Sequence, residues 1–432
     1  MNDPVAGTAP VSPAAAPRRR PLLLWLPALV VAGVVASLGV GVDAEPGKTP
    51  NTWIDVRSHA ASGEGTRADP WVDALRNALA VHGSDHTYHL PGGFYQDSSA
   101  LVIQNDNVSI IGDGGEGATL TTVIYEKDDG SSCWKFLSRE PGKYLAGIHV
   151  RGIHFFGNMK ATGAAIEIES IRRGVFDDIL ITRFQGDQTT WANKGVWLKG
   201  WDSISFRRLR CYRVTRCIFI DVNPNHPTID ADHFHFEDVT LVPGDKAHGV
   251  GIEVVADHVM NLVFDGTNTI AGANKGVYWH NRGKSAMGLN FTLENVRIEQ
   301  GGYRDDSWGV FIEHSDTLRQ FVARGVRVSS GYHGFYLRGV GYITMDNCFV
   351  MGGATSGRHG DRESGYTAYD IDAYGKMPVV MTNCSYMKWN ERSQMKIADE
   401  LVFDAGDALR IYQDGGRVML PDRESANESG AR

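Results

Sequence analysis

Cysteine is scarce in this chain of 432 residues, and its arrangement excludes two common classes of small protein. The five cysteines are Cys133, Cys211, Cys217, Cys348 and Cys384. An odd number of cysteines without a Cys-x-x-Cys pair argues against a disulfide framework and against a zinc ribbon.

Basic tracts are missing after residue 20, and the chain carries a net charge of −8. Because nucleic-acid binding requires clustered lysine and arginine, we expect no nucleic-acid partner. A strongly acidic polymer would need a local basic groove or a bridging cation.

Long apolar runs are confined to the N-terminus. Three arginines occupy positions 18–20, and Pro21 to Val42 then contain no charged residue. This pattern predicts a secretory signal ending near Ala44, and the run is also long enough for an uncleaved membrane anchor. Either alternative predicts that residues 45–432 are extracellular or at the cell surface.

Helical periodicity is nearly absent, whereas short alternating segments recur. Each has two inward apolar residues, a bend at Gly, Asp, Asn or Arg, and two further alternating positions. The bends fall 22 to 36 residues apart, at positions 152, 178, 208, 238, 266, 295, 325, 347 and 383. A repeat of about thirty residues with one shared core is typical of a solenoid.

A second short strand follows a small residue in every unit, as in KGVWLKG from 194 and KGVYWHN from 275. Leucine-rich and βαβ repeats would require helices, and propeller blades would require about 40–45 residues and four strands. The pattern therefore predicts an all-β fold, a parallel β-helix of about 9–10 coils stacked roughly 4.8 Å apart.

The region 55–125 carries a more specific signal. Asp55-Val56 precedes a short amphipathic stretch, followed by Leu90-Pro91-Gly92-Gly93-Phe94-Tyr95 and by Gly112-Asp113-Gly114. This region resembles the N-terminal signature of pectate-lyase-superfamily proteins, although Gly63-Glu64-Gly65 stands where the family usually has an aspartate. The resemblance implies a right-handed parallel β-helix with an N-terminal capping helix. The family includes polyuronate lyases, polygalacturonase-like hydrolases, epimerases and virus tailspikes.

The expected organisation has four parts. Residues 1–44 form the signal or anchor, 45–85 a linker and capping helix, 86–390 the β-helix, and 391–432 a C-terminal cap and disordered tail.

Strand alternation assigns one face of the solenoid a column of aromatic and charged side chains. Its outward positions are Glu167, Trp197, Phe219, Glu253, Tyr278, Phe311, Tyr336 and Asp372, with Glu169, Lys199, Asp221, Val255, His280, Glu313, Arg338 and Tyr374 two residues further on. Flat rings suit sugar faces, so we expect Trp197, Phe219, Tyr278, Phe311 and Tyr336 to bind substrate. The alternative is that loops fold over these rings and make them core.

Two reactions fit the charged groups beside these rings. In lytic elimination, His280 would be the base, Arg338 would hold a uronate carboxylate, and Tyr278 or Tyr336 would protonate the leaving oxygen. In inverting hydrolysis, Asp221 and Glu253 would be the carboxylate pair, with Glu313 another candidate. The alternative is a charge ladder in which Glu313 pairs with His280 and Arg338.

The chain lacks the known catalytic motifs of two groups within this family. The Asn-Thr-Asp, Gly-His-Gly and Arg-Ile-Lys series of polygalacturonases is missing, as is the Val-Trp-Ile-Asp-His of calcium-dependent pectate lyases. Catalytic residues therefore cannot be transferred from the family. We expect no cofactor; calcium stays open without a supporting motif.

Three further patterns have simple alternatives. His233, His235, Asp230 and Asp232 make a weak metal-site hypothesis around the sequence HFHFEDVTL. A mixed-charge column from Arg151 to Asp346 predicts plain solvated surface. Cys348 and Cys384 fall at equivalent positions of consecutive coils, which suits either a disulfide or inward stacking of small residues.

The leading functional hypothesis is an extracellular enzyme, a lyase or glycoside hydrolase, acting on an acidic polysaccharide in a groove along the solenoid. The alternatives are a non-catalytic glycan-binding or adhesive β-helix and a tailspike-type receptor-binding protein. The expected partner is a polysaccharide, with membrane contact only through an uncleaved N-terminal segment. A monomer and a homotrimer are both open.

Overall fold

The computed structural model describes residues 52–114, 120–187, 189–200, 202–222, 232–256, 258–280, 287–301, 306–331, 333–352, 369–373, 379–388, 401–404, 409–413 and 416–418. The predicted signal or anchor lies outside these residues. Within them, no helix is long and apolar enough to cross a membrane.

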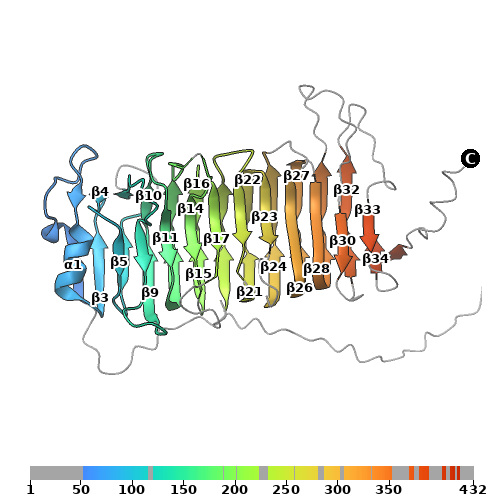
Figure 1. Ribbon diagram of the computed structural model, residues 1–432, viewed down its shortest axis with the longest axis horizontal. Helices are drawn as coiled ribbons and strands as arrows, with labels where there is room; N and C mark the ends of the chain where they lie inside the picture. Colours follow the sequence, from blue (N-terminus) through green and yellow to red (C-terminus); the bar gives the residue numbers. More distant parts are fainter. Residues whose placement is uncertain are drawn as a thin grey trace, which may run out of the picture. The chain divides into compact units, whose positions relative to one another are not determined.

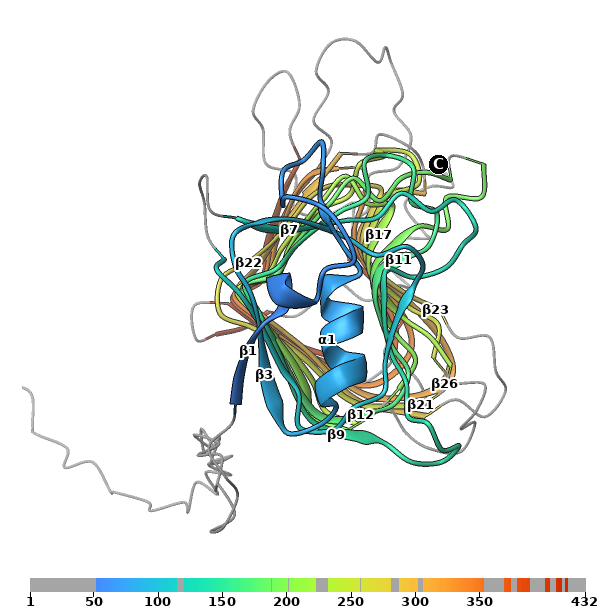
Figure 2. The same ribbon diagram turned by 90° about the vertical axis from the view of Figure 1, so that its left-hand side faces the viewer.

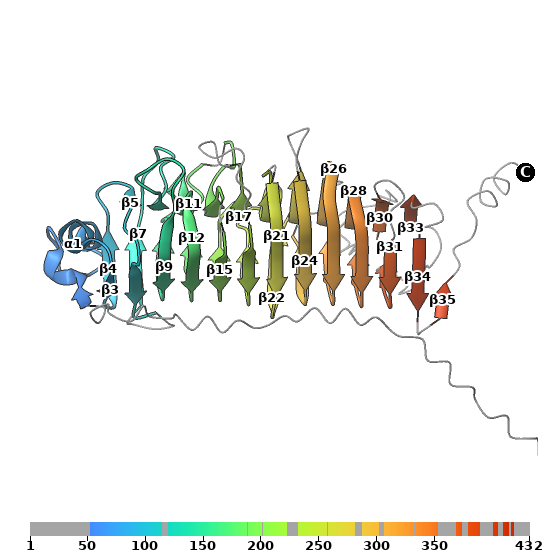
Figure 3. The same ribbon diagram turned by 90° about the horizontal axis from the view of Figure 1, so that it is seen from below.

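The described chain is a parallel β-helix whose coils have three faces (Figures 1 and 3). The first face consists of β5 (Leu101–Ile103), β8 (Trp134–Phe136), β11 (Ala164–Ile168), β14 (Lys194–Leu198), β17 (Arg216–Ile220), β20 (Val250–Val254), β23 (Lys275–His280), β30 (Tyr369–Ala373) and β33 (Leu401–Asp404). Two long strands, β26 (Trp308–Arg324) and β28 (His333–Asp346), run from the first face into the second.

The second face contains β1 (Thr52–Asp55), β3 (His86–Leu90), β6 (Ser109–Gly112), β9 (Leu145–Arg151), β12 (Ile171–Asp177), β15 (Ile204–Arg207), β18 (Phe234–Glu237), β21 (His258–Asp265), β24 (Met287–Glu294), β31 (Val379–Thr382) and β34 (Leu409–Gln413). A last strand, β35 (Gly416–Val418), pairs with β34 and is antiparallel to it.

The third face is a separate sheet of twelve strands. They are β2 (Trp71–Val72), β4 (Gly93–Gln96), β7 (Thr121–Ile124), β10 (His154–Phe156), β13 (Leu180–Thr182), β16 (Arg210–Tyr212), β19 (Thr240–Val242), β22 (Asn268–Ala273), β25 (Val296–Gln300), β27 (Arg327–Gly331), β29 (Phe349–Gly352) and β32 (Ser385–Lys388). The expected fold class is confirmed. The first bend of the sequence pattern is at residue 152. The coils that contain β2, β4 and β7 come before it, so the number of coils expected from the bends leaves them out.

The bends between the second and third faces lie where the sequence pattern places them. All nine bend residues have positive φ, from 51° at Asn295, Asn347 and Asn383 to 75° at Gly266. Glycine and asparagine tolerate this left-handed conformation best, which explains why the pattern favours them.

The interior is a continuous stack of apolar side chains. Phe176, Phe206, Phe236 and Phe264 are fully buried on four consecutive coils. Their rings are nearly parallel, with centroid separations of 4.7, 5.3 and 4.6 Å. The phenylalanines of HFHFEDVTL therefore belong to the core that every coil shares.

A short helix, α1 (Ala74–His82), lies across the N-terminal end of the coils (Figure 2). It buries Ala74, Leu75, Ala78 and Leu79 and follows the 3₁₀ helix η1 (Val56–His59). Covering the open end in this way protects the unpaired edge of the first coil and its apolar interior.

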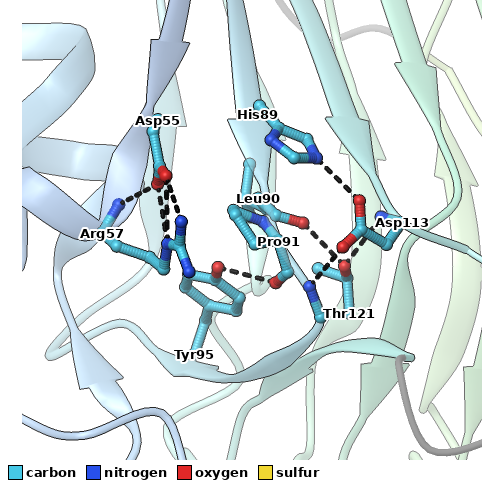
Figure 4. A network of polar contacts seen from close by, with 9 residues as sticks. Asp55, Arg57, His89, Leu90, Pro91, Tyr95, Asp113 and Thr121 are labelled. Atoms are coloured by element: carbon cyan, nitrogen blue, oxygen red, sulfur yellow. Dashed lines mark hydrogen bonds and ion pairs between the residues drawn. The ribbon is translucent and has the colours of Figure 1, made fainter.

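The signature residues near the cap make a network of polar contacts (Figure 4). Asp113 bonds the His89 imidazole through Oδ1 and accepts the backbone N–H of Gly92 through Oδ2, both at 2.7 Å. Tyr95 donates its hydroxyl to the carbonyl of Pro91 at 2.8 Å. Hydrogen bonding to the Arg57 guanidinium lowers the pKa of Asp55. These residues hold the first coils together, which is a structural role.

The two cysteines that lie on adjacent coils near the C-terminal end are free thiols and are not joined by a disulfide. Cys348 and Cys384 precede strands β29 and β32, which pair with each other. The hydrogen bond between the two thiols raises the pKa of Cys348. Cys348 is fully buried, as expected for inward stacking.

Candidate functional site

The first face carries the aromatic column expected from the sequence. Strand pairing places Glu167, Trp197, Phe219, Glu253, Tyr278, Phe311 and Tyr336 opposite one another on seven consecutive coils. We refer to these seven residues as the central column. Its rings are only partly exposed, and Phe219 is 5% exposed.

The expected continuation of this column into the next coil is wrong by two residues. Asp370, and not Asp372, lies opposite Tyr336, while Asp372 lies opposite Arg338. The cause is in the core, where the buried ring of Tyr369 stacks on Phe335 with centroids 5.5 Å apart. The inward and outward alternation is unchanged, but the pairing moves by two residues because Tyr369, and not Ile371, takes the inward position opposite Phe335.

A column of basic and aromatic side chains lies three residues before the central column, at the start of each strand. It comprises Lys194, Arg216, Lys275, Trp308 and His333, with Val250 between Arg216 and Lys275. We call these residues the leading column. Sequence reasoning missed it, although the signal was visible: most of these residues immediately precede a glycine.

The glycines themselves have a packing reason. A Cβ added to Gly276 would lie 2.5 Å from Ile298 Cγ2, and one added to Gly309 would lie 2.4 Å from Val328 Cγ1. The corner between the third and first faces therefore leaves no room for a side chain. The residue before each glycine is placed regularly at the edge of the first face.

The cations of the leading column lie over rings of the central column. Lys194 Nζ is 4.1 Å from the ring centroid of Trp197 and 5.2 Å from that of Phe219. Arg216 is 5.3 Å from the ring of Phe219, and Lys275 is 4.9 Å from the ring of Tyr278. Cation–π contact thus links the two columns on three coils, those of Trp197, Phe219 and Tyr278.

Lys194 is the most perturbed of these cations. Burial lowers its pKa to about 8, and the nearby charge of Arg216 adds to this effect. Its ammonium group donates to the carbonyl of Ala192 at 3.0 Å, and the charges of Asp221, Glu167 and Glu253 partly oppose the lowering of its pKa. An amine in this state gains from the approach of an anion.

Glu253 is a nearly buried carboxylate at the middle of the face, 3% exposed. Its Oε1 lies 3.0 Å from His280 Nε2 in a hydrogen bond. Its Oε2 lies 2.7 Å from Arg216 Nε as an ion pair, without the alignment of a hydrogen bond. Glu253 therefore orients His280 and neutralises Arg216.

His280, Glu313 and Arg338 lie on consecutive coils, as the sequence predicted. The charge ladder centred on Glu313 does not form among the described residues, because His280 bonds Glu253 instead. The imidazole of His280 also stacks on Tyr278 with ring centroids 4.1 Å apart. Arg338 lies over the ring of Tyr336 at 4.9 Å.

Asp221 contributes to this arrangement through its charge, which raises the pKa of Lys194 and partly opposes the effect of burial. It lies two residues beyond Phe219, and its Oδ1 accepts the backbone N–H of Val222 at 2.9 Å. No contact joins it to Glu253 within the described part of the chain. The two carboxylates expected to form a hydrolytic pair thus have separate environments.

The N-terminal part of the face holds a compact charge cluster that sequence reasoning did not find. Glu167 and Glu169 are 5% and 3% exposed, and Lys135 and Lys199 lie between them on the adjacent coils. Lys199 Nζ is 2.6 Å from Glu167 Oε1, and Lys135 Nζ is 2.7 Å from Glu169 Oε2. Its two acidic and two basic groups compensate one another, so the cluster is self-contained.

The C-terminal part of the face is a set of stacked rings. Phe311 and Tyr336 are parallel within 4°, with centroids 4.3 Å apart. Trp308 and His333 stack beside them at 4.2 Å. The face therefore changes from charged to aromatic along the solenoid axis.

The structure separates the residues of the weak metal hypothesis around HFHFEDVTL into different surroundings. His233 precedes strand β18 and has φ 57°, whereas His235 lies within the strand and bonds Asp265 at 2.8 Å. The two histidines therefore have different partners. Asp230 lies outside the described residues.

Asp232 and His233 instead lie beside Asp202, with three ligand atoms within 4.8 Å of one another. Arg172 already neutralises Asp202 at 3.2 Å. Asn261 contacts both Asp232 and His233. In this structure these polar contacts hold the three side chains together.

The mixed-charge column of the second face has the expected register. Arg151 pairs with Asp177, Arg207 with Glu237, and Arg324 with Glu294, at 3.8, 3.2 and 2.7 Å. Mutual neutralisation along this face fits a solvated surface.

Comparisons with known proteins show no family-level relationship. No family model matches the chain, and no curated protein matches it. Similar solved structures include ORF18 of Geobacillus virus E2, at 13% identity and TM-score 0.43, covering 70% of this chain and 58% of that one. The gp42 tailspike of Acinetobacter phage vb_AbaP_AS12 has 13% identity and TM-score 0.44, with coverage of 86% and 64%.

The catalytic unit of a GH87 alpha-1,3-glucanase from Streptomyces thermodiastaticus has 11% identity and TM-score 0.41, with coverage of 86% and 70%. The chain thus spans less than two thirds of the length of the two viral proteins. At these scores the comparisons do not bear on the site.

Proposed function

We propose that the first face binds an acidic polysaccharide and that His280, oriented by Glu253, cleaves it by elimination. The observation that carries this proposal is the leading column of Lys194, Arg216 and Lys275 lying over the rings of the central column. Aromatic rings offer apolar area to sugar faces, and cations offer charge to uronate or sulfate groups.

Binding follows from the spacing of the coils. Adjacent strands are about 4.8 Å apart, so successive cations repeat along the same axis as a bound chain. Lys194 makes no direct ion pair with a described residue, while Arg216 and Lys275 are paired with Glu253 and Asp306.

In the proposed elimination, the base is the imidazole nitrogen of His280 that is not bonded to Glu253. Nε2 of His280 is bonded to Glu253, so Nδ1 is the atom that would take the proton from C5 of a uronate. The electron pair of that C–H bond forms the C4–C5 double bond, and the C4–O bond breaks. Tyr278, stacked on His280, would protonate the leaving oxygen.

Hydrolysis fits the geometry less well. Glu253 is engaged by Arg216 on one side and by His280 on the other, and it makes no contact with Asp221 among the described residues. Asp221 does not share a site with it. The structure therefore favours His280 as base over a carboxylate pair.

Binding without catalysis is the second candidate, and one observation favours it. Phe219 and Glu253 are almost completely buried, so the middle of the face offers a chain little access to these two groups. A glycan could then be held by the outer rings and cations alone. This candidate shares the ligand class with the first and differs in the reaction.

A panel of acidic and neutral polysaccharides tests the proposal. We expect binding of polyuronates and no binding of dextran, with products that absorb in the ultraviolet because elimination creates an unsaturated uronate. New reducing ends without that absorbance would establish hydrolysis and contradict the proposed reaction. Retention without products would establish the binding-only candidate.

Substituting the base sharpens this test. His280→Gln should lower the cleavage rate by about 10²–10⁴-fold, because general-base catalysis contributes that factor, while glycan binding persists. His248→Gln, in a histidine that stacks on Trp191, is the matched control and should keep full activity. Equal rates for His280→Gln and wild type would remove His280 from the mechanism.

The location and assembly of the protein are part of the proposal. The N-terminal pattern supports a protein exported from the cytoplasm, where polysaccharides of this class are accessible. Light scattering distinguishes a monomer from the homotrimer expected of a tailspike-type protein.

A further inference from the structure

A group of histidines lies at the N-terminal cap, away from the first face. His59 ends η1, His82 ends α1, and His86 begins β3. The Nε2 atoms of His59 and His82 are 3.2 Å apart, and the ring centroids of His82 and His86 are 5.8 Å apart. The polar network of the cap uses His89 and leaves these three histidines out.

We propose that His59 and His82 are ligands of a divalent transition-metal ion, with zinc as the best-suited ion, bound between η1 and α1. Zinc binds imidazole nitrogen at about 2.0–2.1 Å, so two nitrogens 3.2 Å apart would subtend about 100–106° at the metal. This angle is close to the tetrahedral value of about 109°. The separation therefore suits a shared ion without movement of the backbone.

The two ligands are held on elements already fixed to each other. Asn77, in the middle of α1, donates its amide to the carbonyl of His59 at 3.0 Å. Val56 of η1 and Ala78 of α1 are both fully buried in the core. Binding would therefore cost little ordering of the backbone, which favours affinity.

The surroundings favour a cation at this position. His82 is the last residue of α1, where unpaired carbonyl groups and the helix dipole give a negative potential. His86 packs against His82 edge to face and helps to fix the position of that ring, but it is not one of the proposed ligands. Water completes the coordination of an ion that has fewer than four protein ligands.

Isothermal titration calorimetry of the full chain with Zn²⁺ tests the proposal. We expect saturable binding near one ion per chain that weakens at least tenfold in His59→Gln and in His82→Gln. Binding should also weaken in acid, because protonated imidazole cannot ligate a metal. The absence of binding in the wild-type chain would overturn the proposal.

Two controls separate this site from other metal-binding groups. Asp232→Asn removes the acidic group beside His233, and His248→Gln removes an exposed histidine elsewhere; both should bind Zn²⁺ as the wild type does. Binding that survives both cap substitutions, or that disappears in Asp232→Asn, would contradict the assignment. Circular dichroism confirms that each variant is folded, and excess Zn²⁺ should raise the Tm of wild type but not of His82→Gln.

Discussion

Asp97 is a carboxyl group enclosed within the first coils. It is 6% exposed, accepts a hydrogen bond from Trp134 Nε1 at 3.3 Å, and lies 3.9 Å from the guanidinium of Arg76. Burial raises its pKa to about 7, and the cation of Arg76 only partly opposes this effect. The protein therefore keeps Asp97 largely protonated below neutral pH.

Asp97 makes stability depend on pH in a defined direction. Between its unfolded pKa of 3.8 and about 7, the folded state binds more protons than the unfolded state, so stability falls as pH rises through about 7. Asp97→Asn removes this ionisation. The stability of the variant relative to wild type should therefore be about 1–3 kcal/mol greater at pH 8 than at pH 5.

Urea unfolding at both pH values measures this difference. Asp128→Asn, at an exposed carboxylate, is the control and should change stability equally little at both. A gain for Asp97→Asn that is the same at pH 5 and pH 8 would show that ionisation is not the cause.

The positions and contacts of single side chains on the first face were predictable only in part. Alternation alone places Trp197, Tyr278 and His280 outward, because each neighbour along a strand must point inward. The partner of Glu253 was not predictable. Arg216 and His280 reach it from the coils on either side, and sequence spacing says nothing about how long side chains lean across coils.

At the scale of elements, the bends are the most local feature of the fold. Asn347 has φ 51°, and the equivalent bends use glycine, aspartate or arginine. Asn347→Ala should destabilise the protein by about 1 kcal/mol because alanine tolerates this conformation poorly, whereas Asn347→Gly should be nearly neutral.

Thermal or urea unfolding of the two variants measures the bend effect. Thr344→Ala, at an outward position of β28, provides a control for loss of polar side-chain contacts. If alanine and glycine at 347 were equally destabilising, lost side-chain contacts and not backbone conformation would be responsible.

His154 links three strands of the third face. Its Nδ1 contacts the hydroxyl of Thr122 at 3.2 Å, and its Nε2 contacts that of Thr182 at 2.8 Å. Burial lowers its pKa to about 4, and the charge of Arg210 adds to this effect. The folded protein therefore holds this imidazole in its neutral form.

Protonation of His154 in acid should lower the stability of the protein. Because its folded pKa is lowered from 6.5, the unfolded state binds more protons, and stability is lost as pH falls from about 6.5 to about 4. The loss reaches up to about 3 kcal/mol. His154→Gln should lose less stability than wild type over this range, as measured by urea unfolding; parallel losses would exclude His154.

At the scale of the whole molecule, the repeat made the fold predictable. Bends and strand register are set by neighbouring residues and by the need of every coil to share one core. The register was missed where a local pattern was ambiguous, as at Tyr369, where a buried tyrosine replaced an aliphatic residue. The leading column was missed because each of its residues looks unremarkable in its own strand.

The proposed function depends on the whole face and not on one group. Cations and rings from several coils act together only because the solenoid stacks them in register. Electrostatic attraction of this kind should weaken as salt rises, since exposed charges are screened over about 10 Å at 0.1 M ionic strength.

The most direct test is the affinity of the protein for a polyuronate over a range of salt concentrations, with the leading column altered. The variant Lys194→Gln/Lys275→Gln is compared with Lys143→Gln/Lys246→Gln, which removes the same charge from exposed positions elsewhere. We predict that the first variant binds at least tenfold more weakly at low salt and that the second binds as the wild type does. Equal affinity of both variants would contradict the assignment of the first face as the glycan-binding surface.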